Sequence, residues 1–149
     1  YEQQELGFNY RMTDIHAALA LSQLNRLDAY VKTRNELAGR YLEKLIDSRI
    51  TLPSTAVESV SSWHLFVIKL DQGQNRKQVF NYLRSRNIGV NVHYIPVHYQ
   101  PYYQSIGFKK GFFPKAEKAY GAALSLPIFP TLSNAQQDYV IENVFNSLI

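Results

Sequence analysis

Two short segments of this chain carry the polar side chains best suited to bind an anionic ligand. The first is the loop Gly7-Phe8-Asn9-Tyr10-Arg11, in which Asn9 offers an amide donor and Arg11 a planar cation. Arginine binds phosphate and carboxylate groups through two parallel hydrogen bonds. A helix predicted to begin just after the loop adds free backbone N–H groups. The loop therefore predicts a phosphate site, although the same pattern is also typical of an ordinary polar helix start with a surface arginine.

The second segment is Asn91-Val92-His93-Tyr94, which ends a predicted strand shortly before Pro96. Asn91 and His93 are two residues apart, so they project from the same face of a strand. Strand ends are common places for ligand contacts in α/β proteins, so we predict that this segment contacts a substrate. General acid–base chemistry by His93 would need a positioned partner that the sequence does not reveal. A metal site of His93 and His98 would lack a third ligand, so we predict no metal, and an exposed or edge-strand histidine is the commoner outcome.

Aromatic residues are frequent, with eleven Tyr and eight Phe, and several of the Tyr gather between Tyr94 and Tyr103. Such a cluster favours a pocket wall or an interface over an evenly distributed core. These rings could stack on a base or a sugar ring. They could equally pack on one another beneath an irregular loop, and the sequence does not separate the two interpretations.

Other catalytic chemistries find no support in the residues. The chain contains no Cys, which excludes disulfides, thiolate metal sites and cysteine nucleophiles. It has no Gly-x-Ser-x-Gly motif and no glycine-rich nucleotide loop. None of its eight Lys lies in an apolar or glycine-rich context that would lower its pKa, and Lys69 is predicted to point outward from a strand without a partner. We therefore assign no catalytic residue within the chain.

Composition indicates a globular domain, since 46% of the 149 residues are hydrophobic. No apolar run approaches the roughly 20 residues that span a bilayer, and no signal peptide is visible, so we expect no membrane segment and a cytoplasmic location. The net charge of +4 is compatible with an anionic partner or with a mildly basic surface, and the basic residues are too dispersed to predict nucleic-acid binding. The chain begins on Tyr1, and we expect it to be a piece of a longer protein.

The first predicted element is a long amphipathic helix. Thr13 is a suitable N-cap, Asp14 suits the first turn, and apolar residues recur at helical spacing as far as about Ile46. Gly39 is the expected position of a kink. A helix of this length usually spans a domain junction or packs against a partner.

Helix and strand patterns alternate through the rest of the chain. We predict a loop over 53–62, a strand over Trp63–Leu70, and a helix capped by Asn75 to about Asn87. A second strand is predicted over Ile88–Tyr94, with Ile88, Val90 and Val92, and by extension Tyr94, on its apolar face. We then predict a short helix from Pro114 to about Ala123, an extended segment over Leu126–Pro130, and a last helix to about Ser147 with a capping box of Ser133 and Gln136. This alternation predicts an α/β or α+β fold.

Four sequence blocks, in the same order, resemble the C-terminal region of the DegT/DnrJ-type sugar aminotransferases, and together they extend over essentially the whole chain. They are Gly7–Ile15 (Gly-Phe-Asn-Tyr-Arg-Met-Thr-Asp-Ile) with Ala17-Ala18 and Gln23-Leu24, Ser62–Phe66 (Ser-Trp-His-Leu-Phe), Asn87–His98 (Asn-Ile-Gly-Val-Asn-Val-His-Tyr-Ile-Pro-Val-His), and Phe113–Glu117 (Phe-Pro-Lys-Ala-Glu) with Leu124–Pro127 (Leu-Ser-Leu-Pro).

The resemblance implies a fold and a cofactor. Residues 1–149 would form the small C-terminal domain of a fold-type-I aminotransferase dependent on pyridoxal 5'-phosphate (PLP), with a long connecting helix and a small, mostly antiparallel sheet with flanking helices. By this resemblance, Asn9 reaches the PLP phosphate of the other subunit of a homodimer with shared active sites, and Arg11 lies near the same phosphate. Residues Asn91 to Tyr94 then contact the nucleotide sugar. The Schiff-base lysine and the aspartate that pairs with the pyridine nitrogen would lie in a preceding domain, so the chain alone would be inactive.

Within the family, the segments around His93–Tyr103 and Phe112–Glu117 are most similar to the 4-aminotransferases of pseudaminic acid biosynthesis. This similarity implies that glutamate donates an amino group to the 4-keto position of a UDP-linked 6-deoxy-N-acetyl-hexosulose. Two other hypotheses stay open on the residues alone. One is a non-catalytic module that binds nucleotide sugars or phosphate, and the other, an RNA-binding domain, depends on the basic pI alone.

Overall fold

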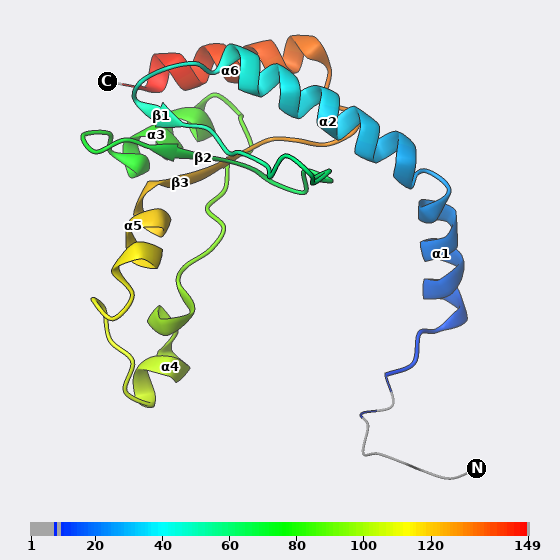
Figure 1. Ribbon diagram of the computed structural model, residues 1–149, viewed down its shortest axis with the longest axis horizontal. Coiled ribbons are helices and arrows are strands. Elements are labelled where there is room, and N and C mark those ends of the chain that lie inside the picture. The colour runs from blue at the N-terminus through cyan, green and yellow to red at the C-terminus, as the bar shows by residue number, and fades with distance from the viewer. Residues whose placement is uncertain (1–7, 9, 149) are drawn as a thin grey trace.

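The computed structural model describes residue 8 and residues 10–148, and it contains a small antiparallel sheet with helices packed around it (Figure 1). The elements are α1 (Asp14–Leu24), α2 (Leu27–Lys44), β1 (Ile50–Thr51), β2 (Phe66–Leu70), α3 (Arg76–Ser85), the 3-10 turn η1 (Val97–Tyr99), α4 (Pro101–Ser105), α5 (Pro114–Ala122), β3 (Ala123–Leu126) and α6 (Asn134–Ser147). The strands are ordered β1-β2-β3, and both pairings are antiparallel. The predicted fold class is confirmed.

One face of the sheet forms the core. Alternation along β2 places Phe66, Ile68 and Leu70 on the same side, and the register with β3 adds Leu124 and Leu126. These side chains are buried in a single cluster with residues of α2, α3 and α6. The opposite face carries Val67, Lys69, Ala123 and Ser125 by the same alternation. We call this second face the free face because the core helices α2, α3 and α6 pack on the other one, although Ala123 and Ser125 are buried on it and only Lys69 is exposed.

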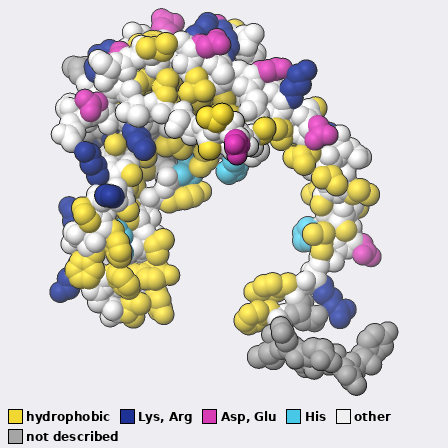
Figure 2. All heavy atoms as spheres, viewed as in Figure 1, with side chains coloured by type: hydrophobic (Ala, Val, Ile, Leu, Met, Phe, Trp, Pro, Cys, Tyr) yellow, Lys and Arg dark blue, Asp and Glu magenta, His cyan; other side chains and the backbone are white. Residues whose placement is uncertain are grey.

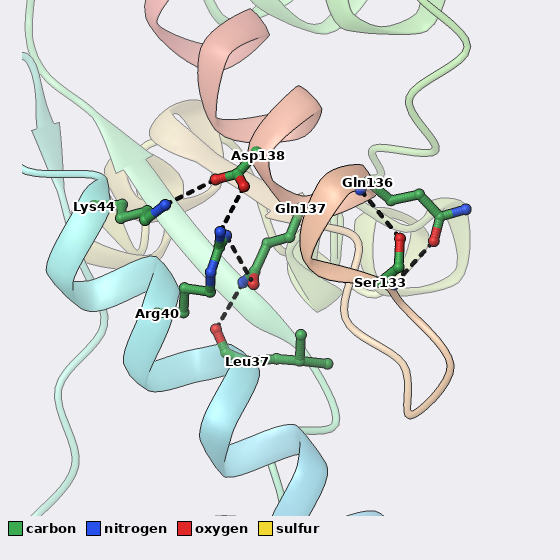
Figure 3. A network of polar contacts seen from close by, with 7 residues as sticks. All are labelled: Leu37, Arg40, Lys44, Ser133, Gln136, Gln137 and Asp138. Carbon is green, nitrogen blue, oxygen red and sulfur yellow. Dashed lines mark hydrogen bonds and ion pairs between the residues drawn. The ribbon is translucent and has the colours of Figure 1, made fainter.

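Helices α2 and α6 lie side by side over the sheet and are joined by a polar network (Figure 3). The fully buried amide of Gln137 donates from Nε2 to the carbonyl oxygen of Leu37 at 2.7 Å and accepts from Arg40 at 3.4 Å. Asp138 accepts from Arg40 at 2.6 Å and from Lys44 at 2.9 Å. Because the Gln137 amide is completely removed from water, these bonds fix how the two helices are aligned.

Side chains of α2 also hold the two loops that meet at one end of the sheet, before β2 and after β3. Arg34 donates to the carbonyl oxygens of Trp63 at 2.9 Å and Ile128 at 3.0 Å. The hydroxyl of Tyr41 donates to the carbonyl oxygen of Pro127 at 2.9 Å, and burial raises the pKa of Tyr41 above its ordinary value, against a smaller opposing effect of Arg40. Tyr41 therefore stays neutral and keeps its hydrogen bond.

Two extensions leave this body on the same side (Figure 1). We call residues 10–24, which contain α1, the helix arm, and residues 94–113, which contain η1 and α4, the aromatic arm. The space-filling view shows the molecule hollowed between them, with apolar side chains gathered on both (Figure 2). Helix α1 has no buried residue, and Ile15, Leu19 and Leu24 are all exposed. None of the helices in the described part of the chain combines the length and apolarity that a bilayer-spanning helix needs.

The prediction of one helix over residues 14–46 with a kink at Gly39 was wrong about the break. Gly39 lies inside α2, whereas the chain bends at Asn25 and Arg26. There the N–H of Arg26 bonds to Gln23 O at 3.0 Å, an i to i−3 bond that tightens the last turn of α1. Only α2 has a face that packs on the core, and α1 turns away from it.

The predicted strand over 63–70 begins late, at Phe66, because Trp63 has a φ of +46° that interrupts extended backbone. The predicted strand over 88–94 was wrong as a strand, since only Asn91 forms a β-bridge, to Ser125. The N–H of Val90 is used locally by Ile88 O and that of Val92 by Asn91 Oδ1, so neither is available for a ladder. The predicted apolar face is confirmed for Ile88 and Val90, which are buried, and for Val92, which packs against the core, but its extension to Tyr94 was wrong, because that ring is 74% exposed.

Strands β1 and β3 were not predicted, and the short helix ends at Ala122, so residues 123–125 belong to the sheet. The capping predictions are confirmed. Thr13 accepts from His16 N, Asn75 accepts from Lys77 N and Gln78 N, and Ser133 forms a capping box with Gln136.

Candidate cofactor and substrate site

A compact polar network joins Asn91, His93 and Ser125 on the free face of the sheet. Asn91 and Ser125 exchange both backbone hydrogen bonds, at 3.2 and 2.8 Å, which fixes the loop against β3. His93 Nδ1 lies 2.8 Å from Ser125 Oγ, and His93 Nε2 lies 3.2 Å from Asn91 Nδ2. Both ring nitrogens of His93 therefore have partners, and the ring is held in one orientation.

The bonding pattern also assigns the tautomer of His93. Asn91 Oδ1 accepts from Val92 N at 2.8 Å, which directs the NH₂ group of Asn91 toward the histidine. His93 Nε2 is then the acceptor, and Nδ1–H donates to Ser125 Oγ. In this arrangement Asn91 and Ser125 are the positioned partners that the sequence did not reveal.

The predicted substrate segment combines half-buried side chains that hold it in place with an exposed aromatic ring. Val92 is half-buried against the core, and His93 is half-buried beside it. The ring of Tyr94 is 74% exposed and meets the His93 ring edge-on at a centroid distance of 4.6 Å. A sugar or a base approaching this face would meet His93 and Tyr94 without any rearrangement of the backbone.

The aromatic arm is fastened to α5 by a shielded hydrogen bond. His98 Nε2 donates to Glu117 Oε1 at 2.9 Å, and the two side chains are only 7% and 14% exposed. The same carboxylate oxygen accepts from Gly111 N at 2.7 Å and from Phe113 N at 3.4 Å. Glu117 thus collects donors from both ends of the arm. The expectation of an exposed or edge-strand histidine was wrong for His98.

Electrostatics favour the ionised form of Glu117. Burial alone would raise its pKa, but hydrogen bonds from His98, Gly111, Tyr99 and Phe113 together lower the pKa of this carboxyl below its ordinary value. The carboxylate therefore remains charged and keeps the arm closed onto α5 at neutral pH.

Many rings of the aromatic arm contact one another, yet several stay open to solvent. Tyr102 meets Tyr103 edge-on at 5.4 Å, and Phe108 stacks on Phe113 at 6.1 Å. Tyr102 is nevertheless 69% exposed and Phe112 56%. The interpretation of rings packed on one another is therefore confirmed for part of the cluster, and stacking on a base or a sugar ring stays a prediction.

Asn9, the predicted ligand of the cofactor phosphate, lies outside the described residues. Arg11 is exposed at the start of the helix arm, two residues before the N-cap Thr13. A guanidinium group followed by a capped helix start fits an anionic group such as a phosphate. Arg11 lies on the helix arm, whereas the Asn91–Tyr94 segment lies beside β3 at the start of the aromatic arm (Figure 1), so the chain does not by itself combine its two predicted sites.

Sequence reasoning missed two residues of the site, Ser125 and Glu117. Alternation offered a signal for Ser125, because Leu124 and Leu126 face the core and the residue between them must face the other way. For Glu117, a carboxylate in the first turn of a helix that begins with Pro114 gave no hint of a buried histidine partner. No cluster of three or more His, Asp or Glu that could hold a metal ion occurs among residues 8 and 10–148.

The sequence profile of the DegT/DnrJ/EryC1/StrS aminotransferase family matches residues 1–145. The chain belongs to this family. It is 42% identical to the spore coat polysaccharide biosynthesis protein SpsC of Bacillus subtilis, over 97% of this chain and 39% of SpsC.

Solved structures of sugar aminotransferases have the same fold. The apo-form of Spr1654, a sugar aminotransferase from Streptococcus pneumoniae, superposes with a TM-score of 0.86 at 31% identity, over 91% of this chain and 35% of that one. PseC of Helicobacter pylori, an aminotransferase involved in pseudaminic acid biosynthesis, gives a TM-score of 0.88 at 27% identity, over 99% and 40%. The chain therefore spans about two fifths of the length of these relatives. Spr1654 has also been solved in PLP and PMP forms.

Proposed function

We propose that this chain is the C-terminal domain of a PLP-dependent transaminase that aminates a nucleotide-linked keto-sugar. The family match over residues 1–145 carries this proposal. The polar network of Asn91, His93 and Ser125, beside an exposed aromatic arm, supports it from the geometry. PLP, when bound, supplies the electron sink that amino-group transfer requires.

The helix arm is the part of the chain that we propose to hold the cofactor phosphate. Arg11 and the backbone N–H groups at the start of α1 suit a phosphate dianion, and Asn9 would add an amide donor. We infer that the lysine that binds the cofactor covalently lies in another part of the protein, so the chain alone does not catalyse the reaction.

The segment Asn91–Tyr94 is the part that we propose to bind the sugar. His93 is held with Nδ1 directed at Ser125, so its role is to present a fixed ring and the neighbouring Asn91 amide to hydroxyl groups. The exposed ring of Tyr94 adds a flat apolar surface beside these polar groups. His98 and Glu117 keep the aromatic arm in place around this segment.

A homodimer with shared active sites would bring the two sets of residues together. Within one chain the helix arm and the aromatic arm extend from the same side of the body but lie apart from each other (Figure 1). No residue of the described part of the chain buries the apolar side chains of α1. We propose that the helix arm of one subunit completes the site of the other.

The narrower substrate assignment depends on the similarity to 4-aminotransferases of pseudaminic acid biosynthesis, to which PseC adds a structural neighbour. We propose glutamate as the amino donor and the 4-keto group of a UDP-linked 6-deoxy-N-acetyl-hexosulose as the acceptor. The enzyme so described would act in the cytoplasm.

The role of the helix arm can be tested by PLP retention. Asn9→Ala and Arg11→Gln in the full-length protein should each weaken PLP binding by about tenfold, because each removes a hydrogen-bonding partner of a charged phosphate. Asn146→Ala, an exposed change on α6, is the matched control. Unchanged PLP affinity in both arm variants would contradict this role, and failure of the unaltered protein to bind PLP would contradict the proposed function.

A further inference from the structure

A groove of about 620 Å³ lies between the edge of the sheet and α5, and it shares no lining residue with the site described above. Its walls come from β1 and β2, from the turn that follows β2, and from one side of α5. The lining residues are Thr51, Lys69, Leu70, Asp71, Gln72, Gln74, Lys115, Lys118, Ala119, Gly121 and Ala122. A smaller hollow adjoins it at Gln74 and Gly121 and adds Arg76 and Lys77 to the lining.

The charge of these adjoining hollows is strongly positive. Five cationic side chains line them, and Asp71 is their only acidic lining residue. The chain has 16 Lys and Arg and 12 Asp and Glu. Outside these two hollows the basic and acidic residues are equal in number, so the lining of the hollows accounts for the entire net charge of +4. A positive concavity of this kind concentrates anions.

The three lysines of the groove are not neutralised by carboxylate partners within the described part of the chain, unlike the cations of the α2–α6 junction and of the turn before β1. Arg40 and Lys44 share Asp138, and Arg49 pairs with Asp47. Lys69, Lys115 and Lys118, by contrast, make no ion pair with any residue in 8 and 10–148. Their ammonium groups therefore stay available to an anion that enters the groove.

The uncharged lining suits a small ligand better than a macromolecule. The space falls within the usual range of ligand pockets, roughly 300–1,000 Å³. Leu70, Ala119 and Ala122 give it an apolar part, while Thr51 and Gln72 add neutral hydrogen-bonding groups. Lysine ammonium groups are compact, mobile charges that commonly bind phosphate oxygens.

We propose that this groove is a second anion site, which binds a ligand carrying two adjacent phosphate groups, such as a nucleoside diphosphate. Lys69 approaches from β2, whereas Lys115 and Lys118 approach from α5, so a diphosphate would be held from both sides. The diphosphate has two possible sources, a free nucleotide or the nucleotide part of the sugar substrate.

The experiment is a calorimetric titration of the full-length, PLP-loaded protein with inorganic pyrophosphate and with UDP at low ionic strength. Lys115→Gln combined with Lys118→Gln should weaken the binding of both by about tenfold, since two exposed ion pairs are lost. The matched control is Lys32→Gln combined with Arg84→Gln, which removes two exposed helix charges outside the groove. Binding sites elsewhere on the protein contribute equally to both variants. The difference in affinity between the two variants therefore measures binding in the groove.

Competition then separates the two sources. If saturating nucleotide-sugar substrate displaces UDP from the unaltered protein, the groove binds the diphosphate of the substrate, whereas simultaneous binding identifies a separate nucleotide site. Equal affinities of the groove variant and the control for both ligands, or no binding of either ligand by the unaltered protein, would overturn the proposal. The PLP absorption spectrum of the groove variant should be unchanged. Such a spectrum would show that the variant still binds the cofactor, so a change in diphosphate binding could be attributed to the groove and not to loss of the proposed function.

Discussion

The body of the domain and its two arms use apolar residues in opposite ways. In the body, Phe66, Ile68 and Leu124 are fully buried, and every buried side-chain nitrogen and oxygen of residues 8 and 10–148 has a hydrogen-bond partner. On the arms, Leu19 is 60% exposed and Tyr102 is 69% exposed. The body has a well-packed hydrophobic core, whereas the arms carry exposed apolar surfaces of the kind that normally mark interaction sites.

This difference separates stability from function within one short chain. The side chains that hold the body together are packed away from the proposed site, and the proposed site lies on the free face of the sheet and on the arms. Substitutions in the two regions should therefore have different consequences, and the following predictions test that separation.

The largest expected effect is in the core. Leu124→Ala should lower the free energy of unfolding by about 2–5 kcal/mol, because it removes a fully buried side chain and leaves a cavity between β3 and the helices. Urea denaturation of residues 1–149 measures this change. Leu21→Ala, a change of the same size on the exposed helix arm, is the control. A loss no larger than that of the control would mean that the sheet core is not what stabilises the body.

A smaller, pH-dependent effect is expected at the α2–α6 junction. Hydrogen bonds from Arg40 and then Lys44 lower the pKa of Asp138 from 3.8 to about 2. A carboxylate with a lowered folded-state pKa stabilises the fold above the unfolded value, and this contribution is lost as the pH falls through the folded value. The stability difference between the unaltered protein and Asp138→Asn should therefore be constant above about pH 5 and disappear toward pH 2.

Denaturation curves at several pH values measure this difference. Asp28→Asn, at an acidic residue of α2 that forms no ion pair with the described residues, is the control. A stability difference for Asp138→Asn that does not change between pH 5 and pH 2 would argue against the ion pairs as its source.

The smallest effect on the isolated chain is expected on the helix arm. Leu19→Ala should change the unfolding free energy of residues 1–149 by less than about 0.5 kcal/mol, because its side chain packs on nothing in the described structure. In the full-length protein the same change should weaken subunit association, which analytical ultracentrifugation measures. An unaltered dimer in the full-length protein would contradict the proposed role of this arm.

Local patterns predicted the parts of the fold that depend on a few neighbouring residues. Thr13, Asn75 and Ser133 cap helices as expected, because a cap needs only a side-chain oxygen and the next turn. The sidedness of Ile88 and Val90 was also predictable, since alternation determines it. The fold class followed from the order of these elements.

The remaining features depend on contacts between distant parts of the chain. The bend at Asn25 could not be predicted from the sequences of α1 and α2 alone. It separates α2, which packs on the core, from α1, which has no buried residue. Residues 88–94 have the composition of a strand but use their N–H groups locally, so they form a single bridge. The partners Ser125 and Glu117 lie 32 and 19 residues from the histidines they hold, beyond the reach of any local pattern.

The most direct test of the proposed function is the absorption spectrum of the full-length protein purified with PLP, before and after borohydride reduction. We predict a cofactor band in the near-ultraviolet or visible range that reduction removes, with the cofactor then covalently attached to a lysine outside residues 1–149. Peptide mapping by mass spectrometry would locate that lysine. A protein that shows no such band, or whose cofactor is attached to one of the eight lysines of this chain, would contradict the account.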